Sequence, residues 1–178
     1  MAPPPETLTE PDGQGLPLRV NTGQKIRRGL LYQPETNILT FAFLLNYPWE
    51  FLQAPFFKGL GGSAHWEAVK VCTRATVGDA FIMLFAYWSV AIIASDRWWF
   101  RRPRRLQMIG FIAVGIAITV TIDHFAIRSN SPIWGWRYAE IMPTIPVLGI
   151  GLTPLLQWLF LPALAVWFVR RQLEAREI

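Results

Sequence analysis

Four long apolar stretches dominate the pattern of hydrophobic and polar positions along this chain. They cover residues 38–57, 75–95, 106–127 and 144–169. An α-helix rises about 1.5 Å per residue, so about 20 residues cross the roughly 30 Å hydrocarbon core of a bilayer. Each stretch is long enough, and we therefore predict an all-α integral membrane protein whose four transmembrane helices form an up-and-down bundle.

The segments outside these stretches complete the predicted organisation. Residues 1–37 are rich in Pro, Gly, Thr and acidic side chains up to a basic patch. Such a composition buries too little apolar surface to fold alone, so we expect a polar cytoplasmic tail. Residues 38–170 then form the membrane domain, and residues 171–178 form a short cytoplasmic tail.

The basic residues predict how the helices are oriented. Twelve of the 17 Lys and Arg residues lie in the N-terminal tail, in the linker 96–105 or after the fourth stretch. The other five lie in the two alternate linkers: Lys58, Lys70, Arg74, Arg128 and Arg137. Because cytoplasmic loops carry the excess of Lys and Arg, both termini are predicted to be cytoplasmic.

Composition excludes some partners and favours others. The chain is 52% hydrophobic and 16% charged, whereas about a quarter of the residues in a soluble domain are charged. The net charge of +5 comes from residues that flank the apolar stretches, where they contact anionic lipids. We therefore expect the lipid bilayer as a partner, and we expect no nucleic acid.

Polar side chains inside the stretches mark a candidate site. Ionisable groups at membrane depth are costly unless they are paired or hydrated, which makes them candidates for function. The predicted depths place these groups in the outer half of the membrane, and the candidate catalytic residues are Glu50, Asp79, Asp123 and His124. Asn46, Glu50 and Gln53 have the i, i+4, i+7 spacing of one helical face. We expect Glu50 to face the bundle interior, within one-water reach of Asp79, Asp123 or His124.

Each of these residues also has a plainer explanation. Glu50 would be an interfacial carboxylate if its helix turned it outward, and Asp79 would cap a helix that begins near residue 75. Asp123 and His124 are adjacent, so they point about 100° apart and only one can face the core squarely. Asn46 and Gln157 are expected to hydrogen-bond across helices as packing contacts.

The two outer linkers add aromatic residues and a second histidine. Residues 58–74 contain a glycine run followed by His65-Trp66-Glu67. Residues 128–143 contain Trp134, Trp136 and Tyr138. These rings suit an interfacial aromatic belt, or alternatively a lid over the polar residues.

The residue types allow several kinds of chemistry. Imidazole and carboxylate ligands suit Zn, Mn or Fe, and the candidate metal ligands are His65, His124, Glu50 and Asp79. Haem held by the two histidines would require the first outer linker to fold inward. A set of Glu, Asp and His beside an apolar pocket suits acid–base work on a lipid or isoprenoid. The sequence assigns no particular cofactor.

Three segments carry a resemblance to other proteins. They are Asn46-Tyr47-Pro48-Trp49-Glu50-Phe51-Leu52-Gln53, His65-Trp66-Glu67, and the stretch from Met142-Pro143 to Leu155-Leu156-Gln157. Over residues 38–170 the chain resembles an uncharacterised family of small bacterial four-span inner-membrane proteins. The resemblance implies a place in the bacterial inner (cytoplasmic) membrane and carries no activity with it.

Two classes of function follow from these observations. The first expectation is a subunit of a larger membrane complex, for example an energy-transducing or photosynthetic one, with other membrane proteins as partners. The alternative is a small membrane enzyme or metal-site protein that uses the outer polar residues on a lipid or isoprenoid. The sequence alone does not decide whether the chain is an enzyme.

Overall fold

Four long helices make up most of the chain. The computed structural model describes residue 29 and residues 32–131, 135–146 and 149–175. The helices are α2 (Pro34–Gln53), α3 (His65–Ala94), α4 (Arg105–Ala126) and α5 (Leu152–Glu174). Two short 3₁₀ helices, η1 (Ala54–Phe56) and η2 (Trp99–Arg101), and two short strands, β1 (Thr144–Ile145) and β2 (Ile150–Gly151), lie in the connections. The predicted all-α class is confirmed.

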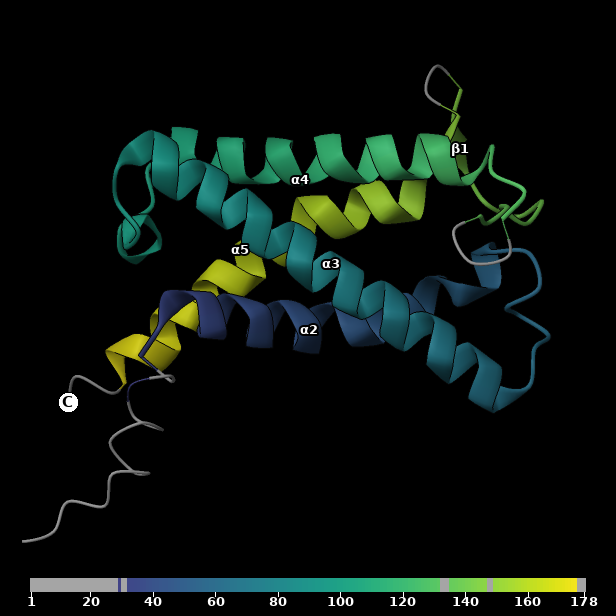
Figure 1. Cartoon of the computed structure of the whole chain (residues 1–178), viewed down its shortest axis with the longest axis horizontal. Coiled ribbons are helices and arrows are strands. Elements are labelled where there is room, and N and C mark those ends of the chain that lie inside the picture. The colour runs from purple at the N-terminus through teal and green to yellow at the C-terminus, as the bar shows by residue number, and fades with distance from the viewer. Residues whose placement is uncertain (1–28, 30–31, 132–134, 147–148, 176–178) are drawn as a thin grey trace, which may run out of the picture.

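Successive helices run in opposite directions, as Figure 1 shows. The start of α2, the α3–α4 connection and the end of α5 lie together at one end of the molecule, which we call the terminal end. The α2–α3 connection and the segment between α4 and α5 lie at the opposite end, which we call the loop end. The predicted alternation of the helices therefore matches the arrangement in the structure.

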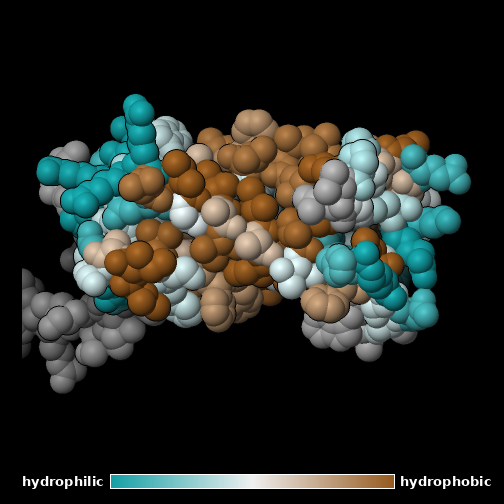
Figure 2. All heavy atoms as spheres, turned by 90° about the horizontal axis from the view of Figure 1, so that it is seen from above, coloured by the Kyte–Doolittle hydropathy of each residue, from teal (hydrophilic) through white to brown (hydrophobic). Residues whose placement is uncertain are grey.

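Among the described residues, three helices are long and apolar enough to cross a membrane: α3, α4 and α5. A hydrophobic band crosses the middle of the molecule between two hydrophilic ends (Figure 2). Helix α2 is 20 residues long but carries several polar residues along one buried face, among them Asn37, Asn46 and Glu50. These groups reduce the mean hydropathy of α2, so it is not among the three helices that are apolar enough to cross a membrane. That α2 also crosses the membrane is a proposal, which is argued below.

Several predicted helix boundaries were wrong. The fourth helix begins at Leu152 and not at residue 144, because Thr144–Ile145 and Ile150–Gly151 pair as antiparallel strands, with Thr144 opposite Gly151. Gly149 has a positive φ of 65°, which lies outside the right-handed helical region, so a helix cannot run through it. Helix α5 then extends to Glu174, into the predicted C-terminal tail.

The boundaries of α3 and α2 also differ from the predicted ones. Both helices begin earlier in the chain than predicted, and α2 also ends earlier. Helix α3 begins at His65, well before residue 75, so His65-Trp66-Glu67 forms its first turn and is not part of a loop. Helix α2 begins at Pro34, inside the predicted tail, and ends at Gln53, before the expected residue 57. The part of the tail that covers residues 1–28 lies outside the described residues.

Small residues allow the helices to pack closely in the middle of the bundle. Ala42, Ala86 and Ala165 are completely buried. Gly115 of α4 lies against the ring of Trp158 of α5, and a Cβ at Gly115 would come within 2.0 Å of that ring. Close approach through small residues is the usual way in which membrane helices gain packing contacts.

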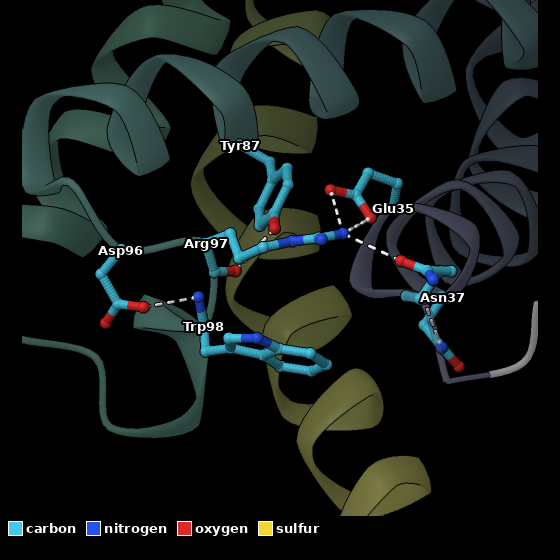
Figure 3. Close-up of polar contacts among 7 residues, drawn as sticks. Glu35, Asn37, Tyr87, Asp96, Arg97 and Trp98 are labelled. Atoms are coloured by element: carbon cyan, nitrogen blue, oxygen red, sulfur yellow. Dashed lines mark hydrogen bonds and ion pairs between the residues drawn. The ribbon is translucent and has the colours of Figure 1, made fainter. Parts of the chain in front are cut away.

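The terminal end is closed by aromatic rings and a surface ion pair. Trp99 and Phe100 are buried, and the ring of Trp99 packs edge-on against Phe111 of α4. The hydroxyl of Tyr87 donates to the carbonyl oxygen of Arg97 (2.6 Å), and the Arg97 guanidinium binds the carboxylate of Glu35 (2.8 Å) (Figure 3). These contacts fasten the α3–α4 connection to the start of α2.

Candidate functional site

A cluster of polar side chains lies inside the bundle, toward the loop end. We call it the polar cluster, and it consists of Asn46, Glu50 and Gln53 of α2, Asp79 of α3 and Gln157 of α5. The three α2 residues are buried, as expected from their shared helical face, and Gln157 is only 3% exposed. Asp79 is half-buried, so it is the member of the cluster that lies nearest the surface of the bundle.

The amide of Gln157 joins the three helices. Its Nε2 donates to Asn46 Oδ1 (2.6 Å) and to Asp79 Oδ2 (2.7 Å), and it lies 3.4 Å from Glu50 Oε1. The predicted hydrogen bond between Asn46 and Gln157 is therefore present in the structure. Because the same nitrogen also binds Asp79, this contact belongs to the cluster and is more than a packing contact between two helices.

The two acidic residues of the cluster touch each other. The carboxyl groups of Glu50 and Asp79 interact directly, and the amides of Gln53 and Gln157 are their other side-chain partners. Gln53 Nε2 donates to Glu50 Oε1 at 2.6 Å. Glu50 thus faces the interior and contacts Asp79, which is the geometry we expected for it. Asp79 lies in the middle of α3, so the alternative that it caps a helix was wrong.

A third acidic residue, Asp123 of α4, lies near Asp79 and holds the segment that follows α4. Trp136 Nε1 donates to its Oδ1 (3.0 Å), and the Tyr138 hydroxyl donates to its Oδ2 (2.5 Å). Burial and this hydrogen bond raise the pKa of Tyr138 above its ordinary value. Its ring also packs at a tilt against that of Phe57, which follows η1, with the ring centroids 5.6 Å apart.

These contacts decide how the second outer linker is arranged. Phe57 and Tyr138 form a β-bridge, and the backbone N–H of Ala139 donates to the carbonyl oxygen of Phe56 (2.9 Å). The segment 135–139 therefore runs from Asp123 of α4 to Phe56 and Phe57, which follow α2, and we call it the lid. The rings of Trp136 and Tyr138 point inward to Asp123, as the lid alternative required, whereas Trp134 lies outside the described residues.

Neither histidine joins the polar cluster. His124 is exposed because it follows Asp123 directly on α4, and Asp123 takes the position that faces the bundle. His65 is exposed at the first residue of α3. Within the described ranges no group of three His, Cys, Asp or Glu side chains lies close enough to hold a metal ion. The structure thus brings Glu50 and Asp79 together and leaves His65 and His124 apart from them.

Two features of the site were missed at the sequence level. Cys72 is buried beside the cluster, with its Sγ 3.7 Å from the carbonyl oxygen of Glu50. The other is that Trp136 and Tyr138 hold Asp123. Their i, i+2 spacing puts both side chains on one side of an extended segment, and this signal was available in the sequence.

Comparisons with known proteins add no relative to this description. The chain matches no family model, no curated protein and no solved structure. The functional argument therefore rests on the polar cluster, the lid and the surrounding helices.

Proposed function

We propose that this chain is a multi-pass protein of the bacterial inner membrane in which α2 is a fourth span and both termini are cytoplasmic. Two observations support this topology. The start of α2 and the end of α5 lie at the same end of the bundle as the arginine-rich α3–α4 connection. That connection is the most basic segment of the described chain, and basic loops stay in the cytoplasm.

Reporter fusions at each end of the chain test the topology. A reporter that is active only in the cytoplasm is expected to be active at both termini. A reporter that is active only in the periplasm is expected to work when it is inserted after Gly61, in the α2–α3 connection. Periplasmic activity at either terminus would refute the proposed orientation.

We infer that the function is proton transfer to and from a lipid-soluble substrate by the Glu50–Asp79 pair. The single observation that carries this proposal is that two carboxyl groups meet inside the bundle, where Gln157 Nε2 lies 2.7 Å from Asp79 Oδ2 and 3.4 Å from Glu50 Oε1. Two carboxylates in contact in a poorly solvated site cannot both hold a negative charge, so they share a proton. Such a pair contains one acid and one base side by side, which is what general acid–base catalysis requires.

The surrounding residues support this role. Gln157 and Gln53 hold the carboxyl oxygens with short hydrogen bonds, so the two groups keep a fixed geometry. The lid is bound to Asp123 at the loop end, and we expect it to limit the access of water to the pair. The protonated member would give its proton to a double bond of the substrate, and the other would accept a proton from the adjacent carbon. The pair is then ready for another cycle, and the substrate leaves as an isomer.

The proposal is tested by lipid turnover in heavy water. Vesicles that contain the purified protein and an isoprenoid or fatty-acyl lipid extract would be incubated in D₂O, and the lipids would be analysed by mass spectrometry. We expect deuterium in a lipid species with the wild-type protein and none with Glu50→Gln. Glu140→Gln, which neutralises an exposed carboxylate outside the cluster, is the matched control. Equal incorporation with Glu50→Gln and with the wild-type protein would refute the role of the pair.

A second candidate function is that of a subunit in a larger membrane complex. The low burial of α4 within the bundle favours this function. Only 17% of the most apolar part of α4 is buried, against 39% for α3 and 44% for α5. Leu106, Ile109 and Phe125 are among its exposed apolar side chains. A helix with so little internal burial has a free apolar face for another membrane protein. Native mass spectrometry of the gently solubilised protein tests this: a stable partner supports it, and a lone chain speaks against it.

A further inference from the structure

A polar groove lies at the loop end, on the surface of the lid. It has a volume of about 450 Å³. Two basic residues, Lys58 and Arg137, and two glycines line it. The other lining residues are polar or aromatic: Ser129, Asn130, Ser131 and Trp136. None of the residues that line it is acidic. The groove therefore combines positive charge with hydroxyl and amide groups.

The two cations of the groove lie directly opposite each other. Lys58 follows Phe57 and Arg137 precedes Tyr138, so the two lie next to the antiparallel bridge between Phe57 and Tyr138, and the N–H of Lys58 donates to the carbonyl oxygen of Arg137 (2.8 Å). Like charges in directly opposed positions destabilise a pair of strands. In the described part of the chain neither side chain forms an ion pair with a carboxylate. An anion bound between the two side chains would neutralise their like charges.

The other lining residues keep the groove open and oriented. Asn130 Oδ1 accepts a hydrogen bond from Arg137 Nη2 (3.0 Å), which holds the guanidinium in place. A Cβ at Gly135 would come within 2.6 Å of the carbonyl oxygen of Ser129, so only glycine allows this tight passage of the chain. The indole of Trp136 forms part of the groove wall and is bound to Asp123 on its inner side.

We propose that this groove binds the phosphate group of a membrane lipid headgroup. A guanidinium and an ammonium beside serine hydroxyls are the donors that phosphate prefers. The groove lies at the loop end, and the ends of the molecule are hydrophilic on either side of the hydrophobic band (Figure 2), so we expect it at the depth of the lipid headgroups. The anion neutralises the opposed cations, so its binding stabilises the lid on which they lie. Binding here is independent of proton transfer at Glu50, and Glu50→Gln is expected to leave it unchanged.

The experiment measures binding by calorimetry with the whole chain in a neutral detergent. One arm titrates short-chain dihexanoyl phosphatidylglycerol, and the other titrates inorganic phosphate. The groove variant Lys58→Gln/Arg137→Gln is compared with Lys70→Gln/Arg128→Gln, which loses the same charge at the same end outside the groove. We expect the groove variant to bind about tenfold more weakly, because charge-assisted hydrogen bonds to the phosphate are lost. The control variant is expected to bind like the wild-type protein.

Thermal unfolding is a second measurement. It distinguishes anion binding by Lys58 from a purely structural role of this residue. Without ligand, Lys58→Gln is expected to raise the unfolding temperature, because one of two opposed like charges is removed. With phosphatidylglycerol, the wild-type protein is expected to gain stability and Lys58→Gln is not.

The two arms distinguish the source of the phosphate. Binding of phosphatidylglycerol without competition by inorganic phosphate assigns the site to lipid headgroups, and competition assigns it to phosphate groups in general. Equal affinity of the groove and control variants, or no binding in either arm, would overturn the proposal.

Discussion

The two ends of the bundle are built from different interactions. At the terminal end, Trp99 and Phe100 fill the space between the helices, and the ion pair between Arg97 and Glu35 lies on the surface. At the loop end, the space between α2, α3 and α5 is filled by carboxyl and amide groups, and the aromatic rings of the lid serve as hydrogen-bond donors. The same four helices thus contain an apolar closure at one end and a polar interior at the other.

This difference indicates where stability and where function lie. Buried rings contribute packing and bury few polar atoms; the rings of Trp99 and Phe100 together bury one polar side-chain atom, the indole nitrogen of Trp99. Buried carboxyl groups are costly to desolvate, and a network of them is retained only where its hydrogen bonds are satisfied. We interpret the terminal end as the part that holds the helices together and the loop end as the part that carries the chemistry.

The largest effect is expected from Trp99→Ala at the terminal end. Removing a fully buried ring leaves a cavity, and the free energy of unfolding should fall by about 3–5 kcal/mol. The measurement is unfolding in detergent followed by circular dichroism. Trp167→Ala is the control, because Trp167 is exposed and its loss should change the free energy of unfolding by no more than about 0.5 kcal/mol. Deuterium incorporation should persist in folded Trp99→Ala protein, and equal losses for both tryptophans would contradict the proposed division.

The next effect is expected from Glu50→Leu in the polar cluster. Leucine leaves the amides of Gln53 and Gln157 without one of their acceptors, at a cost of about 1–3 kcal/mol in the free energy of unfolding. Glu50→Gln keeps the shape and most hydrogen bonds, so its stability should stay near that of the wild-type protein while its proton transfer is lost. An unchanged or higher free energy of unfolding for Glu50→Leu would show that the hydrogen bonds of the Glu50 carboxyl do not stabilise the bundle.

A smaller effect, with a characteristic pH dependence, is expected from Tyr138→Phe in the lid. The variant loses the hydrogen bond to Asp123, which should lower the free energy of unfolding by about 1–2 kcal/mol. The pKa of Tyr138 is raised in the folded protein, so its contribution is fully present below about pH 10, the ordinary pKa of tyrosine. That contribution is lost as the pH rises toward the folded value. The stability difference between the wild-type protein and Tyr138→Phe should therefore shrink above about pH 10, and a constant difference would argue against the buried hydrogen bond.

The smallest effect is expected from Arg97→Gln at the terminal end. Its hydrogen bond to Glu35 raises the pKa of Arg97, but the pair lies on the surface, where salt screens such interactions. The variant should lower the unfolding temperature slightly at low ionic strength and leave it unchanged at high salt. A large loss that persists at high salt would show that this ion pair, and not the aromatic closure, holds the terminal end together.

The sequence by itself determined the class of the protein and the ends of the bundle. Helical apolar stretches, the alternation of the helices and the clustering of arginines near one end follow from local composition, because hydropathy and charge act on each segment separately. The face of α2 that carries Asn46, Glu50 and Gln53 was also readable, since helical periodicity is a local property.

Only the tertiary structure decided which groups meet. The choice of Asp123 over His124 as the inward residue depends on the rotation of α4 against its neighbours, which adjacent positions in the sequence do not determine. The contact between Glu50 and Asp79 joins two helices, and the pairing of Lys58 with Arg137 joins two connections. Such contacts arise from how the helices pack, and that packing depends on small residues such as Gly115 lying opposite large ones such as Trp158.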